Sequence, residues 1–211
     1  MKVCQEIIKH LQMVAIILLC GCGREQENQC RQCDMDYFRS QLQVGDIVFR
    51  RGTGVVGRTV VTVDNEGLYS HVGVVVSVDG ELCVVHAVPG ESDYEGDFDR
   101  VKCDKVEQFM SERRAARGAI YRPEVEDSIK NRVAASAIRL NRKMVRFDHD
   151  YDLSDTTRLY CTELIEYIFG LEGISLSEGR RTDICFPSFS GAHIMPSDLT
   201  KSSKLKVIYS F

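Results

Sequence analysis

The stretch that decides the fold is SHVGVVVSVDGELCVVHAVPG, residues Ser70–Gly90. It consists of two valine-rich runs on either side of Asp79–Gly80, and Asp-Gly between two apolar runs is a strong signal for a β-hairpin with a two-residue turn. The two runs are therefore predicted to be antiparallel neighbours in a sheet. Each run also carries one histidine, His71 in the first and His86 in the second, where a buried strand would ordinarily carry another apolar residue.

The two histidines are predicted to lie at the same end of this hairpin. Counting outward from the turn places His86 opposite Val72 or Gly73, within a residue or two of His71. The sequence parity of the two histidines differs, so we expect a bulge or a longer loop if both are to share one face of the sheet. A histidine that simply satisfies its hydrogen bonds at a strand end is the alternative for each.

The remaining pattern predicts further strands and two long helices. Strands are expected in the segments LQVGDIVFRRG (42–52), GAIYRP (118–123) and KLKVIYSF (204–211). Residues 124–145 have apolar side chains at helical spacing and charged ones opposite, which indicates an amphipathic helix, and residues 155–173 show a second apolar stripe. A short helix is expected within residues 104–114, after a polar loop over 90–100. Strands followed by two helices and a last strand predict an α+β domain.

Composition points to one exported globular domain. The chain has 211 residues, 44% of them hydrophobic and 27% charged, which is typical of a single domain. A net charge of −4 provides no basic field for nucleic acid, so no nucleic-acid partner is expected. A monomer is expected.

The N-terminal 22 residues are predicted to be a lipoprotein signal peptide. Its apolar run LQMVAIILL is too short to span a bilayer, and the following LCGC resembles a bacterial lipobox with Cys22 as the lipidated residue. Plain cleavage and a buried hydrophobic N-terminus are the alternatives. Residues 23–35 are polar and predict a flexible tether, and residues 36–211 are the predicted folded domain. The expected location is the bacterial cell envelope, with a lipid anchor in the membrane.

Nine cysteines make disulfides a possibility in an exported chain. After the signal segment and Cys22 are set aside, six remain: Cys30, Cys33, Cys83, Cys103, Cys161 and Cys185. The CRQC segment that holds the first two could be a zinc half-site, a redox pair, a local disulfide or two incidental thiols. Zinc needs a second pair at matching spacing, which is absent, so no metal or cofactor is predicted.

Cys161 is the predicted nucleophile. It falls in the opening turns of the helix over 155–173, where the positive end of the helix dipole stabilises a thiolate. A helical cysteine is more often a small buried apolar residue, so this position needs a partner. His71 is the candidate base, and His86 is the candidate third polar residue that orients its ring.

Several segments resemble the YiiX- and YaeF-like family, permuted papain-like enzymes of the wider NlpC-type group. They are VGDIVF, YSHVGVVV, VVHAVPGE, FDHDYD, YCTELI and MPSDL, in order from Val44 to Leu199. The resemblance implies a circularly permuted papain-like fold in which the histidine precedes the cysteine. It also implies that Cys161 is the nucleophile and His71 its base. His86 stands where many relatives carry glutamate, and it supplies no fixed negative charge.

The predicted function is a cofactor-independent cysteine hydrolase of amide or related acyl bonds that works through a thioacyl intermediate. Family analogy permits cell-wall peptides, N-acyl amino acids or lipids as the substrate, with a slight preference for the first. Ser70, Tyr151 and Tyr160 are the predicted substrate-binding residues, although packing is an alternative for Tyr160. A lipid-directed acyltransferase or thioesterase that uses the same site, and a weakly active substrate-binding lipoprotein, are the other candidates.

Other motifs are interpreted as structural. GTGVVG (52–57) matches a dinucleotide-binding fingerprint, but too few residues follow for a crossover helix, so it is expected to be a loop near the cleft. FDHDYD (147–152) could suggest a metal, yet a solvated loop that lines the cleft through Tyr151 and its aspartates is expected. His193 and Glu91 have no identifiable partners in the sequence and are expected to be structural.

Overall fold

The computed structural model describes residues 34–64, 66–186 and 189–211. The predicted signal peptide, the lipidation site at Cys22, most of the tether, Cys30 and Cys33 lie outside these residues. The chain divides into two units, residues 1–40 and 41–211. The described part of the first unit is helical, and the second unit holds every element discussed below. Within the described segments, no helix is both long enough and apolar enough to cross a membrane.

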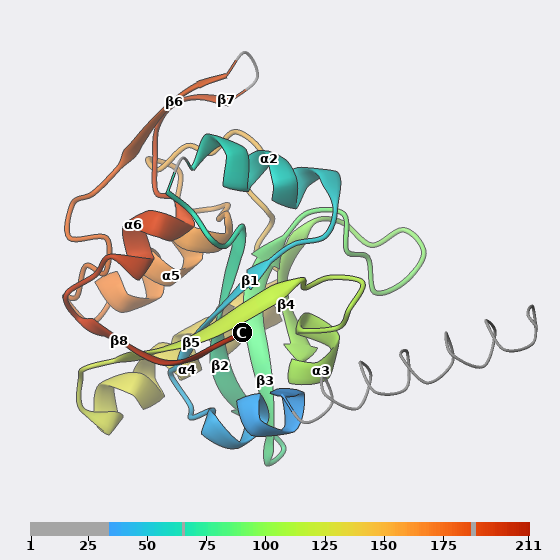
Figure 1. Cartoon of the computed structure of the whole chain (residues 1–211), viewed down its shortest axis with the longest axis vertical. Coiled ribbons are helices and arrows are strands. Elements are labelled where there is room, and N and C mark those ends of the chain that lie inside the picture. The colour runs from blue at the N-terminus through green and yellow to red at the C-terminus, as the bar shows by residue number, and fades with distance from the viewer. Residues whose placement is uncertain (1–33, 65, 187–188) are drawn as a thin grey trace, which may run out of the picture. The chain divides into compact units, whose positions relative to one another are not determined.

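The described residues of the second unit form one large sheet, one small hairpin and five helices. The strands are β1 Ile47–Arg51, β2 His71–Val78, β3 Glu81–Val88, β4 Arg100–Lys105, β5 Arg117–Pro123, β6 Thr182–Phe186, β7 Phe189–His193 and β8 Leu205–Ser210. The helices are α2 Val55–Val63, α3 Val106–Phe109, α4 Asp127–Arg142, α5 Cys161–Gly170 and α6 Pro196–Thr200. Six strands form an antiparallel sheet in the order β4-β3-β2-β1-β5-β8, and β6 pairs with β7 (Figure 1). The predicted α+β class is confirmed.

The core lies between one face of the sheet and the helices α4 and α5. Ala137 of α4 and Leu164 and Ile168 of α5 are fully buried against inward-facing valines of β2 such as Val72 and Val74. Full burial of a leucine or isoleucine side chain contributes about 1.5–3 kcal/mol, so this face supplies much of the stability of the domain. The two amphipathic helices predicted from the sequence are thus confirmed, and α5 begins at Cys161.

The β2–β3 hairpin forms as predicted. Asp79 and Gly80 both have positive φ angles, 51° and 84°, which a two-residue turn of type I′ requires. Val74 lies opposite Val85 in the register, and the same register continues to place Gly73 opposite His86.

The expectation of a bulge between the two histidines is wrong. Across a two-residue turn, an even-numbered residue on one strand always lies opposite an odd-numbered residue on the other. Even-numbered residues of one strand therefore share a face of the sheet with odd-numbered residues of its partner. His71 is two residues from Gly73 on β2, and therefore lies on the same face as His86 without any irregularity.

Two segments differ from their predictions. Residues 100–105, expected as loop and helix, form the edge strand β4, and only Val106–Phe109 is helical. The GTGVVG stretch was expected to be a loop, but it leads into the helix α2. The strands β1 and β2 that flank α2 are antiparallel, so the parallel unit that a dinucleotide site requires is not formed here. The β6–β7 hairpin had no prediction.

Gly73 is required by the close approach of the neighbouring strand. A Cβ atom at this position would lie 2.5 Å from Cγ1 of Val84, 2.9 Å from the carbonyl oxygen of Val85 and 3.0 Å from Cβ of His86. We expect Gly73→Ala to destabilise the domain by about 1–3 kcal/mol through overpacking. Chemical denaturation would measure this change. Gly54→Ala is the matched control, because a Cβ there meets nothing within 4 Å; equal stability of both variants would contradict the packing argument.

Candidate active site

Cys161 is the first residue of α5, and its sulfur lies beside strand β2. Backbone N–H groups of Thr162 and Val72 contact the sulfur. The start of α5 is held in shape by the side chain of Glu163, whose Oε2 accepts a hydrogen bond of 3.2 Å from the backbone N–H of Tyr160. The contact with Val72 brings the start of α5 next to the start of β2, where His71 stands.

One pocket joins the residues singled out from the sequence. His71, Ser70, Tyr151, Tyr160 and Cys161 all line it, and His86 lies behind His71. Apart from Thr162, the rest of the lining is apolar and comes from α2, the start of α6 with the two residues before it, and two isolated residues: Val56, Val60, Pro89, Phe147, Ile194, Met195 and Pro196. Among the described residues, this lining contains no ionisable group other than the histidine, the cysteine and the two tyrosines.

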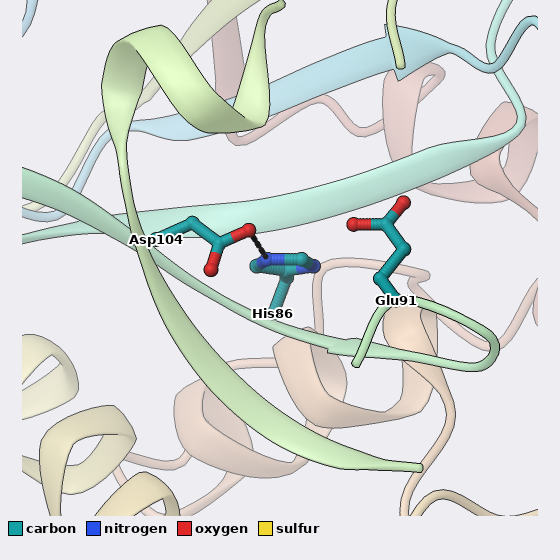
Figure 2. Close-up of side chains that lie close together, drawn as sticks. All are labelled: His86, Glu91 and Asp104. Atoms are coloured by element: carbon teal, nitrogen blue, oxygen red, sulfur yellow. Dashed lines mark ion pairs between the residues drawn. The ribbon is translucent and has the colours of Figure 1, made fainter. Parts of the chain in front are cut away.

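The two histidines and the carboxylate of Asp104, which the sequence did not reveal, follow one another in a row; we call this row the histidine chain. Nε2 of His71 lies 2.9 Å from Nδ1 of His86, and Nε2 of His86 lies 3.2 Å from Oδ2 of Asp104 on β4. The second contact is an ion-pair contact rather than a well-aligned hydrogen bond. Figure 2 shows the imidazole of His86 between the carboxylates of Asp104 and Glu91. Phe109 packs against both imidazoles, with ring centroids 5.7 Å and 4.9 Å away.

The carboxylate fixes the tautomers of both histidines. Burial alone would raise the pKa of Asp104, but the His86 contact and the charges of Lys102 and Arg114 lower it to about 2, so this group is an anion that can only accept. Nε2 of His86 must therefore carry the proton that faces Asp104. Nδ1 of His86 is then the acceptor, and Nε2 of His71 donates to it. Nδ1 of His71 is left as a free lone pair, which is what a general base needs.

Burial and a neighbouring buried arginine together keep His71 neutral. Arg50 lies directly opposite His71 in the β1–β2 register and donates a hydrogen bond of 2.8 Å from Nη1 to the carbonyl oxygen of Phe109. Burial depresses the pKa of His71 well below its usual range, and the charge of Arg50 adds to the fall. His71 is therefore neutral at neutral pH and able to accept a proton.

The thiol is also neutral in the resting state. Cys161 is half-buried and lines the pocket, and the partial burial of its thiol among neighbouring atoms raises the pKa to about 11. The contacts from Thr162 and Val72 and the charge of Arg50 act in the opposite direction without cancelling the rise. The side chains of Cys161 and His71 are therefore both uncharged at neutral pH and do not form a preformed thiolate–imidazolium ion pair.

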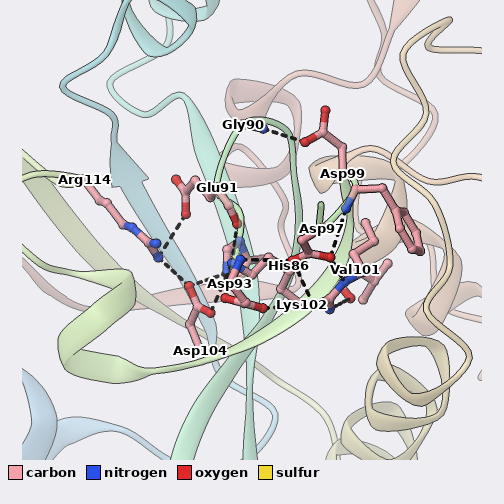
Figure 3. Close-up of polar contacts among 12 residues, drawn as sticks. His86, Gly90, Glu91, Asp93, Asp97, Asp99, Val101, Lys102, Asp104 and Arg114 are labelled. Atoms are coloured by element: carbon pink, nitrogen blue, oxygen red, sulfur yellow. Dashed lines mark hydrogen bonds and ion pairs between the residues drawn. The ribbon is translucent and has the colours of Figure 1, made fainter. Parts of the chain in front are cut away.

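An acidic loop over residues 90–99 packs beside the two histidines and pairs with cationic side chains outside it. Glu91 pairs with Arg50 and lies 3.0 Å from Nη1 of Arg114, which also binds Asp104 at 2.6 Å. Nζ of Lys102 lies 2.6 Å from Oδ1 of Asp93 (Figure 3). These contacts tie the loop over residues 90–99 to the sheet. Glu91, expected to be structural, thus has two cationic partners that the sequence did not reveal.

Among the described residues, His86, Glu91 and Asp104 form a group that could in principle hold a metal ion. One ligand atom from each lies within 4.8 Å of the others. However, Arg50 and Arg114 already neutralise both carboxylates. A divalent cation would have to displace these guanidinium groups or lie beside them, so the donor set as it stands does not fit a metal.

FDHDYD is a loop shaped by a buried aspartate. The carboxylate of Asp148 accepts backbone N–H groups of Asp150 at 3.0 Å and Asp152 at 2.6 Å. Tyr151 adopts a positive φ of 55° and stacks near Tyr160, with ring centroids 5.2 Å apart. Tyr151 lines the pocket, but the aspartates of the loop do not. His193 lies beside the same aromatic pair, 6.0 Å from Tyr151 between ring centroids.

Comparison with known proteins finds a similar fold. No protein-family model and no curated protein sequence matches the chain. Among solved structures, the chain is similar to the crystal structure described as metalloprotein yiiX from Escherichia coli O157:H7, DUF1105, with a TM-score of 0.64 and 17% identity. The match covers 81% of this chain and 98% of that one. At this identity the likeness shows the fold, and the resemblance to YiiX-like proteins is confirmed at that level.

Alkylation of Cys161 by iodoacetamide should follow the raised pKa of the thiol. Because the reactive thiolate fraction rises tenfold per pH unit below a pKa of about 11, we expect the rate to increase about tenfold for each unit between pH 7 and pH 10. Peptide mass spectrometry would separate this cysteine from the others. A rate that is already constant at pH 7 would instead indicate a preformed thiolate.

Replacement of Asp104 by alanine should allow His71 and His86 to populate both neutral tautomers. We expect the wild type to show Nε2–H signals for His71 and His86 in side-chain 1H–15N spectra at neutral pH, and Asp104→Ala to gain Nδ1–H signals. Asp99→Ala is the control, since Asp99 is not part of the histidine chain: it pairs with the exposed His149 at 3.1 Å. Unchanged tautomers in Asp104→Ala would show that the carboxylate does not set them.

Proposed function

We propose that this chain is a cysteine-dependent hydrolase of amide or related acyl bonds, with a permuted papain-like arrangement. The observation that carries the proposal is that Cys161 and His71 line one pocket while His71 is held, through His86, by the anion of Asp104. A nucleophile, a neutral base with a free lone pair and an orienting group are the three parts that acyl transfer through a covalent intermediate requires.

The reaction would proceed in two halves. As the sulfur of Cys161 attacks the carbonyl carbon, Nδ1 of His71 takes the thiol proton. Backbone N–H groups at the start of α5 would stabilise the oxyanion. His71 then donates the proton to the leaving amine or alcohol, which departs and leaves a thioester on Cys161. Water, deprotonated by His71, attacks the thioester and releases the acid and the free thiol.

Asp104 and Arg50 would stabilise charges of opposite sign in this cycle: Asp104 the cation of His71, and Arg50 the thiolate of Cys161. Proton transfer makes His71 cationic, and the anion of Asp104 stabilises that cation through His86. Arg50 disfavours a cationic His71 in the resting enzyme but favours the thiolate of Cys161. The base therefore stays neutral until a substrate is attacked.

The pocket lining favours an apolar acyl group over a charged stem peptide. A cell-wall peptide carries carboxylates and amines that need charged partners, and the described residues that line the pocket include no lysine, arginine, aspartate or glutamate. Its walls are instead Val56 and Val60 of α2, Phe147 and the residues before α6. N-acyl amino acids and lipids fit this lining better than the cell-wall peptides that the predicted envelope location favoured.

A substrate-binding lipoprotein with little catalysis is the second candidate. One observation favours it: burial raises the pKa of Cys161 to about 11, so little thiolate is present at neutral pH. In either case the predicted lipidation at Cys22 would hold the protein at a membrane surface of the cell envelope.

The neighbour's description as a metalloprotein does not change this proposal. In this chain the candidate ligands His86, Glu91 and Asp104 are committed to the histidine chain and to two arginines. We therefore derive no catalytic step through a metal.

Hydrolysis of p-nitrophenyl esters of increasing acyl length tests both the chemistry and the pocket. We expect kcat/KM to rise by up to about fourfold for each added methylene until the pocket is full, which corresponds to about 0.8 kcal/mol per buried methylene. Cys161→Ser should abolish the activity and His71→Ala should reduce it by about 10²–10⁴-fold.

Two matched variants serve as controls. Cys185→Ser removes an exposed free cysteine, and His149→Ala removes an exposed imidazole, so both should retain wild-type rates. Activity that survives Cys161→Ser would rule out the proposed nucleophile. Stoichiometric retention of intact ester without turnover would support the binding protein.

A further inference from the structure

Cys83 and Cys103 form a pair of thiols on the sheet face that packs against α4, away from the histidine chain. In the β3–β4 register Cys83 lies opposite Lys105 and Cys103 lies opposite Val85, so the two cysteines are diagonal neighbours on one face. Both are free thiols, and each affects the pKa of the other. The register places their side chains on the same face of the sheet, as neighbours on adjacent strands.

The pair is open to small reagents. Cys83 and Cys103 line an open groove together with Ile138 and Arg142 of α4 and Lys105 of β4. Cys83 is 8% exposed, and Cys103 is half-buried. The two basic side chains near the groove would favour approach of an anionic reagent.

We propose that Cys83 and Cys103 are a redox modification site that forms an intramolecular disulfide by exchange with a small disulfide such as glutathione disulfide. The proposal does not depend on the hydrolase function. The Cys83 thiolate attacks one sulfur of the glutathione disulfide, and one glutathione thiolate leaves. The Cys103 thiolate then attacks the mixed disulfide at Cys83 and releases the second glutathione. The two protein thiols lose two electrons and two protons, and glutathione disulfide gains them.

Cys83 is the attacking residue for a physical reason. Burial and the neighbouring sulfur raise the pKa of Cys103 to about 12, whereas the nearby Cys103 thiol lowers the pKa of Cys83 and so favours its thiolate. Burial still raises the pKa of Cys83, so the exchange should speed up as the pH increases above neutral.

The backbone can accommodate the bond. Disulfides join Cα atoms up to about 6.8 Å apart, whereas diagonal neighbours in antiparallel strands are typically about 7–8 Å apart. A shift of about 1 Å closes this gap. β4 can make this shift around Cys103 because it is the edge strand; on the side away from β3 it is bridged only near its start, at Arg100 and Val101, to the segment around Arg146.

The bond would tie together the two strands that carry the histidine chain. His86 lies on β3 three residues after Cys83, and Asp104 directly follows Cys103 on β4. The closed loop would contain residues 84–102, including Glu91. Oxidation would therefore fix the edge strand and hold Asp104 in place against His86.

The test uses the full chain, equilibrated with glutathione disulfide at pH 8, alkylated with N-ethylmaleimide and digested without reduction. We expect a linked peptide pair that contains Cys83 and Cys103, lost on treatment with dithiothreitol. The oxidised protein should melt roughly 6–12 °C higher than the reduced protein, as expected for a closed loop of this length. Cys185→Ser should retain the link and the shift, and Cys103→Ser should lose both.

Three outcomes would overturn the proposal. The two cysteines could be recovered as N-ethylmaleimide or glutathione adducts after equilibration, they could be bonded to other cysteines, or they could be linked to each other only in urea. Each outcome would show that the native sheet does not allow this bond. Because no step involves Cys161, the result is independent of the ester assay.

Discussion

The candidate site depends on the contact between Nε2 of His71 and Nδ1 of His86, because every other group in it acts through these two rings. The contact exists because a two-residue turn fixes the register of β2 and β3, and because Gly73 leaves room for the close approach of β3 around Val84 and Cβ of His86. A shift of one residue in this register would turn one histidine to the opposite face of the sheet. The turn at Asp79–Gly80 is therefore as important to the chemistry as the ionisable groups.

The buried charges around these rings are balanced rather than isolated. The carboxylates of Glu91 and Asp104 face the guanidinium groups of Arg50 and Arg114, and Lys102 lies close to Asp104. Removal of one member would leave an uncompensated charge in a dry environment, which typically costs about 3–5 kcal/mol. Burial lowers the pKa of both histidines and so keeps them neutral, while the network provides a fixed anion behind them.

The sequence predicted the hairpin, both long helices and the position of Cys161, since each has a strong local signal in periodicity or turn chemistry. It did not predict β4, because Arg100–Lys105 alternates charged and apolar residues and lies behind a polar loop. Asp104 was missed along with β4, because its role depends on a contact with the neighbouring strand that no local sequence pattern indicates. The helix α2 was missed because its glycines favoured a loop.

The position of Lys102 and Asp104 on the edge strand has a further consequence. An edge strand exposes unpaired backbone groups to which another chain can add, and charged side chains that point inward from such a strand oppose this. Both residues are almost completely buried on the inner side of β4. Replacing them with apolar residues would therefore do more than disturb the histidines: it would leave this side of the sheet open to intermolecular strand pairing and so to aggregation.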